Sequence, residues 1–312
     1  MCVVRVFLAG GGGVIGRPLI WQLVEAGHDV VASTRRPERI ELLHSLGASP
    51  VLLDAFDRDA VRRELLAARP EVVIHQLTAL PARYEPAKPA FYTLTNRLRT
   101  EATRHLVEAA RASGARRFVF QSISFMYELR GPRVLDETAP LARSAPEPFG
   151  SAVRATIEGE RLALESPGLS GVVLRYGQLY GPGTYFGRNG DMARRARRRL
   201  LPIVGEGSGV FSFLHVEDAA AAAVRALSEG SGVYNVTDDE PAPAREWIPA
   251  YCAAVGAPEP LRIPFWLARL LAGRTVAANL LSSRGASNAK AKTELGWKPL
   301  FPSWREGFHS LD

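Results

Sequence analysis

Residues 5–16, RVFLAGGGGVIG, join a short apolar run to a helical pattern through four consecutive glycines. The run from Val6 to Leu8 is typical of a strand that is covered on both faces. From Val14 to Ala26, apolar residues recur at helical spacing. We therefore expect the chain to begin with a strand, a tight turn and a helix in immediate succession.

The glycine turn has the composition that a dinucleotide site requires. Without side chains, its backbone can approach a pyrophosphate at the positive N-terminus of the helix. Gly11, Gly13 and Gly16 satisfy the spacing GxGxxG, while Gly10, Gly13 and Gly16 satisfy GxxGxxG, so the loop alone leaves the subfamily open. A plain turn is the alternative, but the flanking strand and helix favour a cofactor site. We predict contacts with the cofactor at Gly10, Gly12, Gly13, Val14, Ile15 and Gly16.

The 312-residue chain is long enough for one large α/β domain or for two lobes that share a core. With 46% hydrophobic and 23% charged residues and no apolar run of ~18 residues, we expect a soluble, cytoplasmic protein without membrane contact. The first apolar run ends in the glycines and has no signal-peptide cleavage site. Cys2 and Cys252 cannot form a disulfide framework, and no Cys/His cluster has metal-ligand spacing, so no metal is expected.

The second strand, predicted over His28–Ser33, leads to the segment that decides between NAD and NADP. An NAD-selective site has an acidic residue about 20 positions after the glycines, which binds the ribose 2′-hydroxyl. Positions 33–36 read STRR instead, and the guanidinium groups of Arg35 and Arg36 would pair with a 2′-phosphate. These arginines could also belong to the solvated start of a helix at Pro37–Arg39. We predict that the cofactor is NADP(H).

The third strand is predicted over Pro50–Leu53, and Asp54 and Ala55 follow its end. A carboxylate at this position can accept a hydrogen bond from the adenine amino group, although Asp is equally common in loops and as a helix cap. We assign both residues to the cofactor site.

Strands and helices then alternate. We predict helices over residues 57–68 and 92–113 and strands over residues 72–75 and 117–121. This alternation predicts an α/β fold with a doubly wound parallel sheet of the Rossmann type. His75 ends an apolar strand, where a hydrogen-bonded core histidine is more common than a catalytic one.

Further segments follow the glycine loop in a recognisable order. They are residues 94–122 with Asn96, residues 174–183 (LRYGQLYGPG), residues 213–218 (FLHVED), and NAK at 288–290 with LGW at 295–297. Together with the GxxGxxG spacing, they resemble the extended short-chain dehydrogenase/reductase family, which includes nucleotide-sugar epimerases and dehydratases. The resemblance covers almost the whole chain.

The resemblance implies a division into two parts. An NADP(H)-binding Rossmann domain is expected over residues 1–176 plus about 208–236. A smaller, discontinuous substrate-binding lobe is expected over about 177–207 plus 237–312, and residues 184–191 (TYFGRNGD) are expected to form a mobile lid. Further cofactor contacts are expected at Leu77, Thr78, Asn96 and Gln178.

The segments that should carry the family's catalytic triad differ from its pattern. In the family, the Tyr of a Tyr-x-x-x-Lys motif protonates the substrate oxygen, the Lys lowers the pKa of that Tyr, and a Ser holds the same oxygen. Here the usual Ser position falls on Ile123, with Ser122 and Ser124 on either side.

The Tyr and Lys positions are also changed. Two registers are open, with the Tyr position at Gly150 or Ala152 and the Lys position at Arg154 or Thr156. There is no Tyr between residues 127 and 176 and no Lys between residues 88 and 290, so no shift of register restores the triad. Loss of a positioned general acid typically costs about 10²–10⁴-fold in rate.

Substitute groups can be named by motif position. The candidate catalytic residues are Ser122 and Ser124, which end the strand that points at the nicotinamide, and Tyr180. Tyr127 and Tyr185 are the other nearest phenols, and each of these side chains could instead be a packing or hydrogen-bonding residue.

Two other features are interpreted as structural. His215 has a pKa suited to proton transfer, but within FLHVED we expect a structural role, with Asp218 near the cap of a helix over Ala219–Leu227. The arginines between Arg194 and Arg199 encircle a helix, so we expect a solvated helix with one or two functional arginines and no nucleic-acid binding.

Three functions remain open at this point. The first is an NADPH-dependent ketoreductase that acts on an aromatic ketone polarised by its own internal hydrogen bond. The pattern resembles the atypical reductases that tailor aromatic polyketide antibiotics, angucyclinone ketoreductases among them. The second is a nucleotide-sugar epimerase or dehydratase with replacement residues, and the third is a non-catalytic NADP(H)-binding regulator. A small-molecule substrate is expected, and a homodimer is a possibility.

Overall fold

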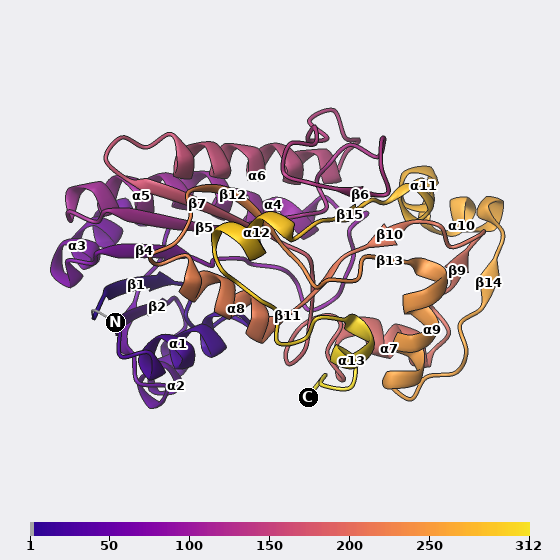
Figure 1. Ribbon diagram of the computed structural model, residues 1–312, viewed down its shortest axis with the longest axis horizontal. Helices are drawn as coiled ribbons and strands as arrows, with labels where there is room; N and C mark the ends of the chain where they lie inside the picture. The colour runs from indigo at the N-terminus through magenta and orange to yellow at the C-terminus, as the bar shows by residue number, and fades with distance from the viewer. Residues whose placement is uncertain (1–2) are drawn as a thin grey trace.

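The computed structural model describes residues 3–312, without the side chains of residues 271, 272, 274–276 and 279, so Cys2 lies outside the described residues. Strands between residues 5 and 236 form a seven-stranded sheet, with the order β12-β7-β5-β4-β1-β2-β3 and every neighbouring pair parallel (Figure 1). Its strands are β1 Arg5–Ala9, β2 Asp29–Thr34, β3 Ser49–Leu52, β4 Val72–His75, β5 Arg117–Ile123, β7 Ser170–Tyr176 and β12 Gly232–Val236. The predicted doubly wound α/β fold is confirmed.

Both faces of the sheet are covered by helices. In β1, Val6 and Leu8 pack into one core cluster with residues of α1, α8 and α12, whereas Phe7 and Ala9 pack into another with residues of α3, α5 and α6. This alternation follows from the two-residue period of a strand. The helices of the two layers are α1 Gly16–Glu25, α2 Ile40–Ser45, α3 Arg58–Ala68, α5 Thr103–Ala112, α6 Phe149–Leu164, α8 Val216–Arg225 and α12 Ala289–Glu294.

The long helix predicted over residues 92–113 is not a regular α-helix. It consists of α4 (Ala90–Arg97), a π-helical segment η2 (Leu98–Ala102) and α5. A π segment inserts an extra residue into the helical turn, which apolar periodicity does not reveal.

The helix predicted over Ala219–Leu227 begins earlier than expected, as α8 at Val216. The side chain of His215 caps it by accepting a hydrogen bond from the Glu217 amide. Asp218 therefore has another role: its carboxylate accepts hydrogen bonds from the Leu300 and Phe301 amides at 2.5 and 3.0 Å and anchors the C-terminal segment. Asp218 lies in the first turn of α8, near its cap as expected, although the helix starts three residues earlier than predicted.

The right half of Figure 1 holds shorter helices and strands. These elements surround a core that is rich in aromatic side chains, including Tyr180, Phe186, Phe213, Trp247 and Phe308. This core draws on residues 180–213 and 242–311, so it crosses the predicted lobe boundary at Phe213, and that boundary stays a prediction. The elements are β6 Val134–Leu135, β8 Gln178–Tyr180, α7 Asp191–Arg197, β9 Ile203–Val204, β10 Val210–Phe211, β11 Phe213–His215, β13 Ala242–Pro243, α9 Ala244–Ala254, β14 Arg262–Ile263, α10 Phe265–Ala272, α11 Arg274–Ser282, β15 Gly285–Ala286 and α13 Trp304–Gly307.

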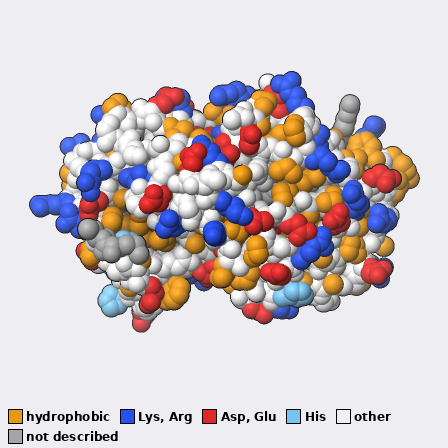
Figure 2. Space-filling model, in the orientation of Figure 1, with side chains coloured by type: hydrophobic (Ala, Val, Ile, Leu, Met, Phe, Trp, Pro, Cys, Tyr) orange, Lys and Arg blue, Asp and Glu red, His pale blue; other side chains and the backbone are white. Residues whose placement is uncertain are grey.

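The described helices include none that is both long and apolar enough to cross a membrane. On the face shown in Figure 2, Lys and Arg side chains are interspersed with Asp and Glu and form no continuous basic stripe.

Candidate functional site

A cavity of about 1800 Å³ opens at the carboxyl ends of the strands. Its wall includes Gly10 after β1 and Gln76 after β4, and β1 and β4 are the neighbours at which the strand order reverses. In a doubly wound sheet this reversal is where ligands bind. Pockets for one small ligand are usually about 300–1,000 Å³, so this cavity has room for a dinucleotide and a second molecule.

The glycine loop forms a cradle that side chains would fill. Gly10 has a φ of +100°, and a Cβ atom there would lie 2.9 Å from the Gln76 carbonyl oxygen. A Cβ atom at Gly16 would collide with the Gly10 oxygen, so the helix can start close to the strand only with glycine at this position. Gly13 lines the cavity, and only the Gly10 oxygen lies near its missing Cβ, at 3.2 Å. These features fit a pyrophosphate against the loop.

Most of the predicted cofactor residues line this cavity: Gly10, Gly12, Gly13, Val14, Arg35, Arg36, Asp54, Ala55, Leu77, Thr78 and Gln178. Three do not belong to its wall and support it from behind. Ile15 is buried in the core, Gly16 allows the close approach of helix and strand, and the Asn96 amide donates a hydrogen bond to the Ser151 hydroxyl at 3.1 Å, which ties α4 to α6. Periodicity and motif position could not distinguish the residues that line the cavity from those that lie behind the lining, because this depends on the direction of each side chain.

A third arginine joins the two that the sequence indicated. Arg39 lines the cavity with Arg35 and Arg36, and its Nη1 donates a hydrogen bond to the Gly12 carbonyl at 2.5 Å. Burial, and next the charges of Arg36 and Arg17, lower the pKa of Arg39. In the described part of the chain, Arg35, Arg36 and Arg39 form no ion pair. This excess of positive charge beside the glycine loop suits a phosphate. The sequence did not indicate Arg39, because Pro37–Arg39 has the pattern of a solvated helix start.

The candidate serines lie at the end of β5. The Ser122 hydroxyl donates a hydrogen bond to Glu160 at 2.6 Å, and Glu160 forms a buried ion pair with Arg175, at 2.8 Å to Nε and 2.7 Å to Nη2. Ser124 is buried and lines the cavity, and its side chain has no hydrogen-bond partner within residues 3–312. Ser122 is therefore occupied by a structural network, while the Ser124 hydroxyl remains available to a ligand.

The three candidate phenols are poor acids. The Tyr127 hydroxyl donates to Asn235 at 2.7 Å and accepts from Arg175 at 2.9 Å, and Tyr185 donates to the Pro81 carbonyl at 2.5 Å. Tyr180 is not part of the cavity wall; it is fully buried with its ring 5.4 Å from that of Phe308, centroid to centroid. Burial raises the pKa of all three phenols. The structure thus brings Ser122 and Ser124 to the cavity but leaves Tyr180 in the aromatic core.

Helix α6 presents no acid or lysine to the cavity. From this helix, Phe149 and Ala152 line the wall. Gly150 packs against the Ala145 carbonyl, Arg154 pairs with Glu147 on the exposed side, and the Thr156 hydroxyl donates to the Ala152 carbonyl at 2.7 Å. Neither register of the predicted Tyr and Lys positions places a proton donor in the cavity.

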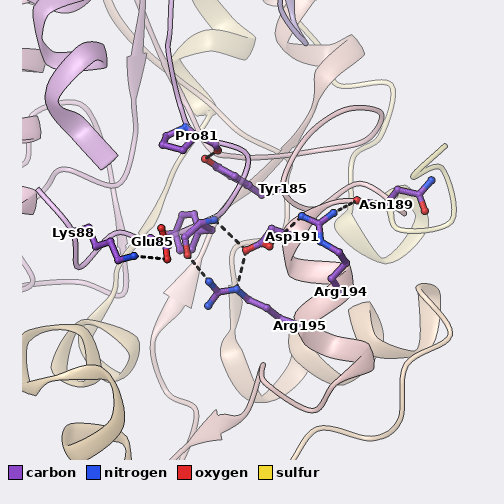
Figure 3. Close-up of polar contacts among 9 residues, drawn as sticks. Pro81, Glu85, Lys88, Tyr185, Asn189, Asp191, Arg194 and Arg195 are labelled. Atoms are coloured by element: carbon purple, nitrogen blue, oxygen red, sulfur yellow. Dashed lines mark hydrogen bonds and ion pairs between the residues drawn. The ribbon is translucent and has the colours of Figure 1, made fainter. Parts of the chain in front are cut away.

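A clasp of polar contacts joins the loop before α4 to α7 beside the cavity (Figure 3). The carboxylate of Asp191, at the start of α7, accepts hydrogen bonds from the Tyr84 amide at 3.1 Å and from Arg195 Nε at 2.8 Å, while Arg195 Nη2 donates to the Tyr84 carbonyl at 2.6 Å. Arg194 contacts Asp191 and the Asn189 carbonyl. Arg195 thus ties α7 to the loop before α4, whereas Arg194 contacts residues of its own segment, 189 and 191.

The ring of His75 is a core group, as predicted. It is 1% exposed, contacts Phe120 edge-on at 5.4 Å, and accepts a hydrogen bond from the Leu77 amide at 3.1 Å through Nδ1. Burial lowers its pKa to about 4. His75 is therefore neutral at physiological pH and cannot supply a cation to the site.

Comparison with known proteins places these features in a family. The family model described as "NAD dependent epimerase/dehydratase family" matches residues 6–237. A protein of a Streptomyces species named 3-diazoavenalumate denitrifying reductase is 52% identical over 306 residues, which cover 97% of this chain and 98% of the relative. A Stigmatella aurantiaca protein named 4-hydroxy-2-methyl-3-oxo-4-farnesyl-3,4-dihydroquinoline-1-oxide ketoreductase is 28% identical, over 86% of this chain and 78% of the relative.

Solved structures share the fold. The Bordetella bronchiseptica enzyme WbmG in complex with NAD has a TM-score of 0.76 and 22% identity, covering 99% of this chain and 93% of its own. A human epimerase family protein with NADPH has a TM-score of 0.73 and 22% identity, covering 98% of this chain and 97% of its own. Structures of this fold are therefore known with either dinucleotide.

Proposed function

The chain belongs to the NAD dependent epimerase/dehydratase family, and on that premise we propose that it is an NADPH-dependent reductase that delivers a hydride to an aromatic substrate without a proton from a protein tyrosine. The named relatives described above are both reductases, which supports an oxidoreductase over an epimerase.

The observation that carries the proposal is the wall formed by α6. Phe149 and Ala152 face the cavity there, and burial raises the pKa of the nearby phenols, for example that of Tyr127. Reduction of a ketone consumes both a hydride and a proton, and a positioned donor usually accelerates it by about 10²–10⁴-fold. A substrate that accepts a hydride without any proton fits this wall better.

An arenediazonium ion is such a substrate, and the 52% identical relative is named for the removal of nitrogen from a diazo compound. When bound, NADPH supplies the hydride to the ring carbon, the carbon–nitrogen bond breaks, and its electron pair leaves with N₂. The cationic acceptor and the hydride balance in charge, so no general acid is required. The protein then has to hold the ring against the cofactor, which can by itself contribute several kcal/mol to the rate.

Aromatic side chains provide the surface for such a ring. Tyr84, Phe91 and Tyr92 line the cavity in edge-to-face contact, with ring centroids 5.5 Å apart for Tyr84 and Phe91 and 5.0 Å apart for Phe91 and Tyr92. Phe149 and Tyr185 extend the same wall. For the cofactor, the cluster of Arg35, Arg36 and Arg39 favours NADPH over NADH.

Ketone reduction on an aromatic polyketide is the second candidate, and the ketoreductase from Stigmatella aurantiaca favours it. In this case the carbonyl would be polarised by an internal hydrogen bond of the substrate, and the free hydroxyl of Ser124 could hold its oxygen.

The test uses NADPH that carries deuterium at the transferred position. With 4-carboxybenzenediazonium, we expect one N₂ released per NADPH oxidised and deuterium on the ring carbon, at a rate above that of the protein-free mixture. The Gly13→Val variant is the matched control for cofactor binding, and 2-hydroxyaryl ketones with their O-methyl ethers test the second candidate. NADPH binding without oxidation in the presence of diazonium ions and ketones would refute a catalytic function.

A further inference from the structure

Arg99 is a buried cation in the cavity wall that the proposed function leaves without a role. It lies on η2, its residue is 8% exposed, and it lines the cavity. In the described part of the chain its guanidinium group makes no hydrogen bond and no ion pair. A buried charge is unfavourable unless a partner of opposite charge or a hydrogen-bond acceptor reaches it.

The backbone around Arg99 is built for this position. The π turn of η2 separates α4 from α5, and such turns are frequent at functional sites. Helix α6 packs closely against it, because a Cβ atom at Gly159 would lie only 2.6 Å from the Arg99 carbonyl oxygen. The close packing holds η2 against α6 at the end of the cavity that the aromatic side chains line.

The neighbouring charges do not neutralise Arg99. The charge of Glu160 raises the pKa of Arg99, but both Glu160 oxygens are taken by Arg175, and Oε1 also accepts from Ser122. The positive charge of Arg99 also contributes to lowering the pKa of His75, which is neutral at physiological pH. Burial lowers the pKa of Arg99 to about 10, so the group remains charged at neutral pH. The carboxylate of Glu160 thus pairs with Arg175 and, in the part of the chain that the structure describes, leaves Arg99 unpaired, so this end of the cavity carries an uncompensated positive charge.

We propose that Arg99 binds an anionic oxygen of the substrate, a carboxylate or a phenolate, and thereby orients the aromatic ring. Arg99 lies on η2 after α4, whereas Arg35, Arg36 and Arg39 follow β2 beside the glycine loop, so the two sets of cations line the cavity from different elements. The glycine loop and its arginines hold the dinucleotide, and Arg99 serves the second ligand. The aromatic nature of that ligand rests on the proposed function; the anionic group rests on Arg99 itself.

The test measures binding, so it does not depend on turnover. Protein saturated with NADP⁺ is titrated in a calorimeter with 4-hydroxycinnamate, its methyl ester and its 4-O-methyl ether. The acid should bind about 10- to 150-fold more tightly to the wild type than to Arg99→Met, the range for a hydrogen bond to a charged group. Arg99→Lys should recover part of the loss. The matched control is Arg104→Met, because Arg104 is an exposed arginine whose Nη2 lies 3.9 Å from Glu158 Oε1. This variant should bind the acid like the wild type.

The arms separate the sources of the anion. Loss of binding on esterification identifies the carboxylate, and loss on O-methylation identifies the phenol oxygen. Equal binding of all three compounds, equal binding by Arg99→Met and the wild type, or no binding by the wild type would overturn the proposal. A drop in NADP⁺ affinity with unchanged binding of the acid would also overturn it, since Arg99 would then hold the cofactor. Failure of the proposed function alone would appear as Arg99-dependent binding of the acid without N₂ release or ketone reduction.

Discussion

Replacing Arg36 with Ala should weaken NADPH binding about 10- to 150-fold and leave NADH binding unchanged. Arg35, Arg36 and Arg39 line the same part of the cavity, and no carboxylate pairs with them within residues 3–312. The charge of Arg36 contributes to lowering the pKa of Arg39, so the two guanidinium groups repel one another. A phosphate relieves this repulsion.

The magnitude follows from the contact that would be lost. A hydrogen bond to a charged group contributes about 1.5–3 kcal/mol, and 1.4 kcal/mol corresponds to a tenfold change in affinity. Arg35→Asp should go further and invert the preference, because a carboxylate repels the 2′-phosphate and can accept a hydrogen bond from the ribose 2′-hydroxyl of NADH.

The assay is fluorescence titration of both reduced cofactors. Arg63→Ala is the matched control, because Arg63 is exposed and pairs with Glu64 at 3.0 Å outside the cavity. An unchanged ratio of NADPH to NADH affinity in Arg36→Ala and in Arg35→Asp would show that the arginine cluster does not read the 2′-phosphate. A loss of affinity for both cofactors would indicate a distorted loop instead.

Three further predictions follow from single contacts. Gly13→Val should abolish NADPH binding in calorimetry without lowering the melting temperature appreciably, since the side chain would enter the cavity; retained binding would contradict the placement of the pyrophosphate. Asp191→Asn should weaken the clasp by about 1–3 kcal/mol and speed hydrogen exchange of the Tyr84 amide. Glu85→Gln on the same loop is the control and should leave this exchange rate unchanged. Equal exchange rates in both variants would argue against the clasp. The folded pKa of His75 lies below its unfolded value of 6.5, so the contribution of His75 to stability is present above pH 6.5 and decreases as the pH falls towards 4. By pH 5 about 2 kcal/mol of the free energy of unfolding should be lost. His75→Gln should lack this part of the pH dependence in urea unfolding, and a pH dependence equal to that of the wild type would be the contrary result.

Local sequence determined the cofactor half of the molecule. The strand, the glycine turn and the helix are contiguous. The turn that joins the strand to the helix requires a φ of +100° at residue 10, which favours glycine. The following strands could be read from their apolar runs, and Val72–His75 was predicted to the residue. Arg35, Arg36 and Asp54 could be assigned to the cavity because parallel strands bring their carboxyl ends to one edge of the sheet.

Tertiary structure decided the substrate half, because there the chemistry depends on groups that are distant in sequence and on the direction of each side chain. Tyr180 follows the motif and yet points into the aromatic core, and the hydroxyl of Ser122 is bound by Glu160, which lies 38 residues away on α6. Among the residues that the structure describes, Arg99 is left without an ion pair because Glu160 pairs with Arg175, a partner 15 residues further along the chain. A sequence specifies which charges exist, but only packing determines which of them are paired, and the unpaired ones are those that a ligand can bind.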